Sequence, residues 1–479
     1  MNPQQSELVR KSIADLKTIS LSSSEPHNDR SLSTVMNAAG INHGFVDFAG
    51  ESATGFSNEG MAIIAALAKT YRPEGDRRSH QVSNETLTKT ISASIAQKWR
   101  DTDRTNIQQS DIDSLGETID RWLADLNQTR LHVVPCALPP YVAPSFQIGP
   151  VCFHHVSNFP TGQFGIQQSE FWPTATEENP NPKPGGFHFE RLLELATERR
   201  APWLAVVEVS GRAIHESITA ADVATDIALG ALQIAAPGLN IRNISRATAR
   251  APVFWRVDPY YRDGQISENN SNLQPALTIH PDLFADVITN KVSSALNVMG
   301  KRLSDYLQAT SAVPDLDEAW CNAAYWFHEA LAETLETVAV VKLETAIEVL
   351  FRAENMSGSK SRIIKAFDTI FGLTKDDVFS GSGITVEQFT LAVTTARSRV
   401  VHGTWPTIHT DLPGYKKNQP VARGELEMVA SSLLIEFAHQ VDAYVKAGQT
   451  ADETDALLDW IKAQRQPSAP TANVSSTGS

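Results

Sequence analysis

An arginine and a histidine near the end of a predicted helix are the side chains best suited to chemistry. Arg397 and His402 stand five positions apart in the sequence. Cleavage of RNA without a metal needs a group that transfers protons near neutral pH and a cation that stabilises the phosphoryl charge. Histidine and arginine suit these two roles. We therefore take Arg397 and His402 as candidate catalytic residues.

The element that must position them is a helix predicted over residues 386–402. Apolar residues form a stripe along it, at Phe389, Val393, Ala396 and Val400. Gly403 follows, where a left-handed residue would end the helix. Five residues on a helix correspond to about 140° of rotation, so one helix does not by itself bring the two side chains together. A homodimer that pairs two such helices could bring them together.

Spacing alone also allows a structural interpretation. Arg397 would then be a solvated surface charge, and His402 a residue favoured at a helix C-terminus by the macrodipole. Two residues make a weak motif, so this interpretation stays open.

The last third of the chain is predicted to be a helical bundle spanning residues 301–463. Strand signals fade after about residue 283, and helices with short connections follow. We expect five of them over residues 317–334, 338–353, 359–371, 386–402 and 424–445. Lys360, Arg362, Lys365 and Arg423, with Lys416 and Lys417, could form a phosphate-attracting rim or an ordinary charged face.

The preceding region, residues 36–300, is predicted to be mixed α/β. Helical spacing covers residues 61–71, 115–126 and 220–235, and extended runs occupy 131–134, 146–156 and 203–209. Pro150 makes the run at 146–156 an edge strand at best. Residues 173–186 are predicted to be a surface loop. Residues 1–35 are expected to be a flexible segment, and residues 464–479 a disordered tail. The fold class is α+β.

Composition limits the functions that remain. The 479 residues carry a net charge of −14, which argues against a broad surface that coats nucleic acid. Three widely spaced cysteines, Cys136, Cys152 and Cys321, predict neither a disulfide framework nor a paired zinc site. We expect no cofactor and no metal. No run of about 18 apolar residues is evident, so a cytoplasmic protein without membrane contact is expected.

Residues 346–351 and 396–403, with a helix between them, resemble the HEPN superfamily, especially its ApeA-like branch. The resemblance covers roughly residues 315–447, and Arg397 and His402 fit the Arg and His of the family motif with four positions between them. The family usually has Asn, Asp or His after the Arg, whereas this chain has Ser398, which can still form hydrogen bonds. Glu348 resembles a family carboxylate that could orient Arg397, or it is an ordinary helix acid.

This resemblance implies a metal-independent endoribonuclease that forms a homodimer and acts in anti-phage or abortive-infection defence. The RNA substrate could be tRNA, and residues 1 to about 300 would sense a phage-derived trigger or regulate the nuclease. Arg397 and His402 would be catalytic, with Ser398 and Glu348 in support. The alternative is a HEPN-like bundle without catalysis that binds nucleotide, RNA or a protein partner.

Overall fold

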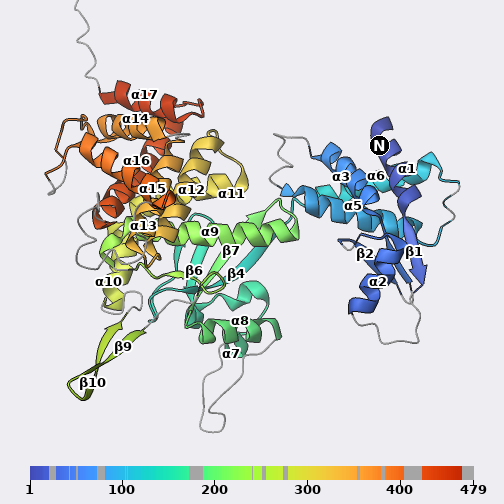
Figure 1. Ribbon diagram of the computed structural model, residues 1–479, viewed down its shortest axis with the longest axis horizontal. Helices are drawn as coiled ribbons and strands as arrows, with labels where there is room; N and C mark the ends of the chain where they lie inside the picture. Colours follow the sequence, from blue (N-terminus) through green and yellow to red (C-terminus); the bar gives the residue numbers. More distant parts are fainter. Residues whose placement is uncertain are drawn as a thin grey trace, which may run out of the picture. The chain divides into compact units, whose positions relative to one another are not determined.

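The computed structural model has an α+β fold, as predicted, with sheets in its N-terminal region and a largely helical C-terminal region (Figure 1). It divides into two compact units, one formed by residues 1–130 with 209–220, the other by residues 131–208 with 221–479. The residues that the structure describes are 1–20, 29–42, 44–49, 52–72, 81–102, 104, 106–171, 187–239, 241–250, 255–272, 279–352, 356–378, 383–403 and 423–465.

The first unit combines helices with a small antiparallel sheet. The strands β1 (Lys17–Ser20), β2 (Val46–Ala49) and β3 (Ser52–Gly55) pair in the order β1-β3-β2. The helices are α1 (Pro3–Asp15), α2 (Asp29–Ala39), α3 (Asn58–Tyr71), α5 (Asn84–Trp99) and α6 (Gln109–Asp125). The apolar faces of α1, α3, α5 and α6 form one core. The helices predicted over residues 61–71 and 115–126 are α3 and most of α6.

The N-terminal segment differs from the predicted flexible end. Asn2 caps α1, since its side chain accepts a hydrogen bond from the Gln5 backbone N–H at 2.8 Å. Val9 and Ile13 of α1 are completely buried in the core of the first unit. The prediction of a flexible segment is therefore wrong for residues 3–20, because the apolar face of a short helix finds a partner surface that local sequence does not reveal.

The second unit contains a five-stranded sheet in the order β5-β6-β7-β4-β8. The strands are β4 (Thr129–Ala137), β5 (Phe146–Ile148), β6 (Val151–His155), β7 (Trp203–Ser210) and β8 (Ser245–Arg246). Leu204 and Val206 of β7 pack with Leu193 of α8 (Phe187–Glu198) on one face of the sheet. The alternate residues Trp203 and Ala205 are also buried, so the sheet is covered on both faces. The short helix α7 (Gln168–Phe171) lies beside α8 (Figure 1).

The run at 146–156 is a hairpin rather than one edge strand. Pro150 lies in the turn between β5 and β6, where its missing N–H is not needed for strand pairing. Strand β5 is at the edge, but β6 pairs with both β5 and β7. The prediction of an edge strand is therefore wrong for β6. The strand predicted over residues 203–209 is confirmed as β7.

The helix α9 (Ile214–Ala235) contains a window long and apolar enough to cross a membrane, although no such run was expected from the sequence. Two thirds of this window, 67%, is buried inside the protein, as in a core helix. Gly230 lets α9 approach α12 (Pro314–Leu331), because a Cβ atom there would lie 2.7 Å from the Ala324 carbonyl oxygen. Helix α9 confirms and extends the helix predicted over residues 220–235.

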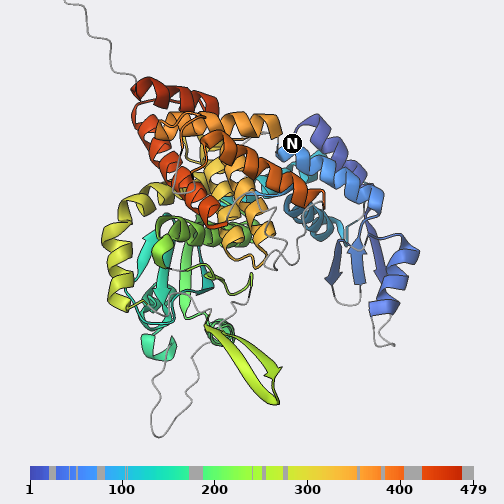
Figure 2. The same ribbon diagram turned by 60° about the vertical axis from the view of Figure 1, so that its left-hand side comes forward.

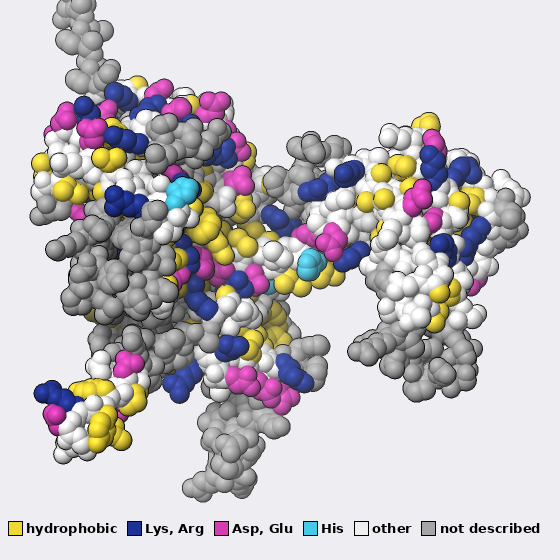
Figure 3. Space-filling view, viewed as in Figure 1, with side chains coloured by type: hydrophobic (Ala, Val, Ile, Leu, Met, Phe, Trp, Pro, Cys, Tyr) yellow, Lys and Arg dark blue, Asp and Glu magenta, His cyan; other side chains and the backbone are white. Residues whose placement is uncertain are grey.

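A two-stranded hairpin, β9 (Trp255–Arg262) with β10 (Gln265–Asn272), carries exposed apolar side chains. Its strands pair antiparallel, with Tyr261 opposite Ile266. These two side chains are 74% and 81% exposed, and Val257 and Tyr260 are exposed too. Figure 3 shows apolar side chains gathered on this hairpin, with charged ones among them.

The rest of the second unit is helical, and its helices pack side by side (Figures 1 and 2). All five predicted helices are present, with ends shifted by a few residues. The helices are α10 (Pro281–Asp286), α11 (Ser293–Gln308), α12 (Pro314–Leu331), α13 (Glu336–Leu350), α14 (Met356–Ala366), α15 (Val386–Val401), α16 (Arg423–Lys446) and α17 (Thr454–Arg465). The central helix α13 packs against α12, α15 and α16.

The helical part and the five-stranded sheet touch backbone to backbone. Gly149, in the left-handed region at φ +57°, turns the β5–β6 hairpin against Gly300 of α11. A Cβ atom on Gly300 would lie 2.4 Å from the Gly149 nitrogen. This contact explains why one compact unit continues across the domain boundary that we predicted near residue 300. The predicted loop at 173–186 and nearly all of the predicted tail at 464–479 lie outside the described residues.

We expect Gly300→Ala to destabilise the protein by about 1–3 kcal/mol, because the new methyl group would overlap backbone atoms that cannot move cheaply. This sign is opposite to the usual gain from Gly→Ala inside a helix. Urea unfolding measures the change. The matched control is Gly424→Ala in α16, where an added Cβ meets open space. Equal stabilities of the two variants would contradict the close contact.

Candidate functional site

The helix that carries the candidate residues has both predicted ends. The Thr385 side chain accepts a hydrogen bond from the Gln388 backbone N–H at 3.2 Å, which completes a capping box at the start of α15. At the other end, Gly403 adopts the left-handed conformation at φ +67°. The predicted stripe is buried at Phe389, Val393 and Ala396. Burial of this stripe sets which face of α15 turns toward α13.

Arg397 projects from α15 onto two glutamates of α13. Its Nη1 lies 2.5 Å from Glu348 Oε2, and its Nε lies 3.3 Å from Glu344 Oε2. The two glutamates are four residues apart, so they share one face of α13. The side chains of Glu344 and Glu348 are only 1% and 8% exposed, whereas Arg397 keeps 39% of its surface in contact with solvent. The guanidinium therefore closes a buried acidic pair and also reaches the surface.

Glu344 keeps its proton at neutral pH. Burial raises the pKa of Glu344 to about 9, and the negative charge of Glu348 adds to the increase, while Arg397 acts against it. Its Oε2 makes no hydrogen bond within the described part of the chain, because the approach of the Arg397 Nε lacks hydrogen-bond geometry. At neutral pH Glu344 is therefore a neutral acid, and the charge of Arg397 is balanced by Glu348.

This arrangement leaves the guanidinium oriented and partly free. It has five N–H donors, and only part of them face the two glutamates. The others, on the exposed side of Arg397, remain available to an anion such as a phosphate oxygen. The site can hold one arginine in a fixed direction at the end of a helix.

His402 is the C-terminal cap residue of α15 and is exposed. Its backbone N–H donates to the Ser398 carbonyl at 3.0 Å. Over the described residues, neither the His402 imidazole nor the Ser398 hydroxyl has a hydrogen bond or ion pair, and neither side chain contacts Arg397 in this way. Within one chain the structure thus joins Arg397 to Glu348, as expected, but it does not join Arg397 to His402.

The described basic residues that were proposed as a phosphate-attracting rim form ion pairs with acidic side chains. Lys360 lies 3.2 Å from Glu387, and Lys365 lies 2.9 Å from Asp459. The remaining described members behave in the same way, with Arg362 near Asp455 and Arg423 near Glu427. Lys416 and Lys417 lie outside the described residues. The described members favour the interpretation of an ion-paired face over that of a phosphate rim.

No group of three or more His, Cys, Asp or Glu side chains with metal-binding geometry occurs in the parts of the chain that the structure describes. Cys136 is buried, and its Sγ donates to the Val134 carbonyl at 3.4 Å. Burial raises the pKa of the Cys136 thiol well above its usual range, so it stays protonated. Its Sγ is therefore a packed thiol.

Comparison of the chain with protein-family models, with curated proteins and with solved structures found no match. The geometry of the site and the sequence motif therefore carry the functional argument.

Glu344 was not among the site residues predicted from the sequence. The signal was present, because Glu344 stands among the apolar residues Val340, Leu343 and Ile347 on a predicted helix, and all three are buried. An acid that falls inside a buried stripe needs a partner or a proton. Its position four residues before Glu348 would have placed it beside the same arginine.

The raised pKa of Glu344 predicts a pH-dependent loss of stability that Glu344→Gln should reduce. Folding raises this pKa from its ordinary value of 4.5 to about 9, so the folded chain binds one more proton than the unfolded chain between these values. The stabilisation from this proton is complete below pH 4.5 and is lost as the pH rises toward 9. Gln cannot titrate, so the stability difference in favour of the variant should grow by about 1.4 kcal/mol for each pH unit, or by about 4 kcal/mol between about pH 5.5 and 8.5.

Urea unfolding at several pH values measures this difference. The matched control is Glu117→Gln on the exposed side of α6, which removes the same charge without touching a buried acid. Parallel stability curves for the wild type and Glu344→Gln would show that Glu344 is not protonated in the folded protein.

Proposed function

We propose that the protein is a metal-independent endoribonuclease of the HEPN type, in which Arg397 and His402 act on the RNA backbone. The observation that carries the proposal is the clamping of Arg397 by a buried acidic pair at the helix end that presents His402. A surface arginine without a role does not need two buried acids, whose removal from water is costly. The motif spacing and the resemblance over residues 315–447 add support.

In the proposed reaction the RNA 2′-oxygen attacks the adjacent phosphorus, and the bond to the 5′-oxygen breaks. The products carry a 2′,3′-cyclic phosphate and a 5′-hydroxyl, and no water is consumed. One proton leaves the 2′-oxygen and one reaches the 5′-oxygen, and His402 carries one of these transfers. Arg397 stabilises the added negative charge on the non-bridging phosphate oxygens.

The two glutamates act through Arg397. Glu348 supplies the charge that holds the guanidinium, and protonated Glu344 packs beside it without adding a second negative charge. With both acids ionised, the cluster would be net negative and would repel a phosphate. The single buried charge therefore suits an anionic substrate.

A homodimer completes the proposed site. Within one chain, Arg397 faces α13, while the imidazole of His402 is exposed and forms no hydrogen bond or ion pair with Arg397. A second copy that pairs its α15 with the first would supply the missing histidine. The region before the helical part would sense a phage-derived trigger or regulate cleavage in anti-phage defence.

The same geometry also fits a second candidate function, in which the helical bundle binds RNA, nucleotide or a protein partner without cleaving RNA. The observation that favours it is that Arg397 already has an ionic partner, so its role could end at holding α13 and α15 together. Binding of RNA by the wild-type protein without any cleavage would support this candidate.

Arg397→Ala and His402→Ala should each lower RNA cleavage about 100-fold or more, because one loses the phosphate cation and the other the proton-transfer group. Purified protein is incubated with tRNA and with total RNA in EDTA, and product ends are analysed. Arg399→Ala on the same helix is the matched control and should keep near-normal activity. Normal cutting by either of the first two variants would refute the assignment.

Complementation tests whether the arginine and histidine come from different chains. Arg397→Ala and His402→Ala chains with two different tags are co-expressed, and the mixed dimer is isolated by both tags. One of its two sites then has an intact arginine and an intact histidine, so activity should recover to about half of the wild-type value. A mixed dimer as inactive as its parents would place both groups of one site on a single chain.

A further inference from the structure

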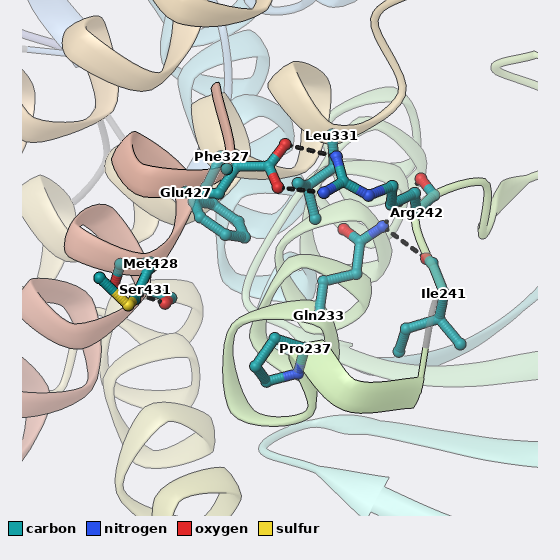
Figure 4. A pocket seen from close by; sticks show the side chains of 10 residues that line it. Gln233, Pro237, Ile241, Arg242, Phe327, Leu331, Glu427, Met428 and Ser431 are labelled. Atoms are coloured by element: carbon teal, nitrogen blue, oxygen red, sulfur yellow. Dashed lines mark hydrogen bonds and ion pairs between the residues drawn. The ribbon is translucent and has the colours of Figure 1, made fainter. Parts of the chain in front are cut away.

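A cavity of about 270 Å³ lies in the second unit, and neither Arg397 nor its two glutamates are among the residues that line it (Figure 4). It is bordered by the end of α9 and the turn that follows it, by α12, and by the first turns of α16. The residues that line it include Gln233, Arg242, Phe327, Leu331, Glu427 and Met428. Its volume is slightly below the range of about 300–1,000 Å³ that is common for drug-sized ligands, so it suits a small molecule.

The apolar part of the wall suits a flat ring. Phe327 and Leu331 of α12 face Met428 of α16, and Pro237 and Ile241 close the other side. An aromatic ring can contact the polarizable sulfur of Met428, which is half-exposed, whereas Phe327 is only 2% exposed and belongs to the packed wall. An unbranched polar molecule would leave these surfaces unfilled.

The charged part of the wall consists of Arg242 and Glu427, and a second arginine, Arg423, lies beside Glu427. Both Nη atoms of Arg242 donate to the Glu427 carboxylate, as Figure 4 shows. Glu427 also accepts a hydrogen bond from Arg423 Nε at 2.7 Å. Two guanidinium groups thus share one carboxylate, which leaves one positive charge without an acidic partner in this cluster.

Arg242 is the group that can serve a ligand. Arg423 directs its other nitrogens to the carbonyl oxygens of Ala330, Leu331 and Glu333 at the end of α12. Arg242 uses one donor on each Nη, and its side chain stays 44% exposed. Its remaining N–H groups call for an acceptor, and an anion is the strongest one.

A buried network of hydrogen bonds holds the wall behind the cavity in place. Gln233 Nε2 donates to the carbonyls of Ile241 and Arg242, and its Oε1 lies 2.8 Å from His328 Nδ1. Arg250 lies 3.0 Å from His328 Nε2, and a guanidinium can only donate, so Nδ1 carries the proton that goes to Gln233. Burial lowers the pKa of His328, which keeps the imidazole neutral. The cavity is thus preformed.

We propose that this cavity is a binding site for a small monoanionic aromatic molecule, with its ring against Met428 and its carboxylate on Arg242. The apolar walls, the preformed backing and the unmatched guanidinium all select this chemical class. The site does not depend on RNA cleavage, so its test is independent of the proposed nuclease activity.

The test titrates the full chain with three probes of the same shape and different charge, using calorimetry. The probes are 2-naphthoate, the neutral 2-naphthamide and the cationic 2-naphthylmethylammonium. The naphthoate should bind at least about tenfold more tightly than the other two, since only it can make a charge-assisted pair with Arg242. Absence of naphthoate binding, or equal binding of all three probes, would overturn the proposal.

Two variants and a matched control locate the binding. Arg242→Met should weaken naphthoate binding at least about tenfold, and Glu427 keeps Arg423 as its partner in this variant. Met428→Trp changes a half-exposed residue and should fill the cavity, so that naphthoate no longer binds. Arg262→Met, on the exposed β9–β10 hairpin, removes the same charge and should bind normally. Unchanged naphthoate affinity in a folded Met428→Trp protein, checked by circular dichroism, would exclude this cavity as the site.

Discussion

The burial of Glu344 and Glu348 beneath one arginine is the constraint on which the helical part depends. Two carboxylates removed from water and placed four residues apart would repel each other and lose their hydration. A proton on Glu344 and the guanidinium of Arg397 remove both costs. Because the guanidinium belongs to α15 and the acids belong to α13, this solution fixes how the two helices face each other. Gly403 then ends α15, so that His402 emerges about one turn beyond the clamped arginine.

The same part of the molecule uses a second buried pair for an architectural purpose. Arg302 of α11 is buried and lies 2.7 Å from Asp317 of α12, which is buried as well. Burial raises the pKa of Asp317 to about 6, while Arg302 acts against that increase. This pair has no exposed donor, in contrast to Arg397, which keeps part of its surface in solvent. The candidate site thus differs from this internal ion pair because its arginine, Arg397, is partly exposed to solvent.

The sequence predicted the positions of the helices better than the contacts between them. The periodic stripe of Phe389, Val393 and Ala396 located α15, and Gly403 located its end, because both signals are local. The contact of Arg397 with Glu348 was expected from the resemblance. The protonated Glu344 was not expected, although its place among apolar residues of one helix was a local signal. The cavity beside Arg242 was not expected either, because it arises where distant helices meet. Residues 3–20 were predicted to be flexible for the same reason, since the surface that buries them comes from later in the chain.

The β9–β10 hairpin has a consequence for how the protein behaves in concentrated solution. Within the described residues its two strands pair only with each other, so the outer edge of each offers backbone groups to a further strand. Packing against the exposed Tyr261 and Ile266 would stabilise such an added strand. Asp258, Arg262 and Glu268 oppose it, since charges along an edge penalise the stacking of identical hairpins. Charged side chains on this ribbon thus count against its addition to further strands in extended sheets.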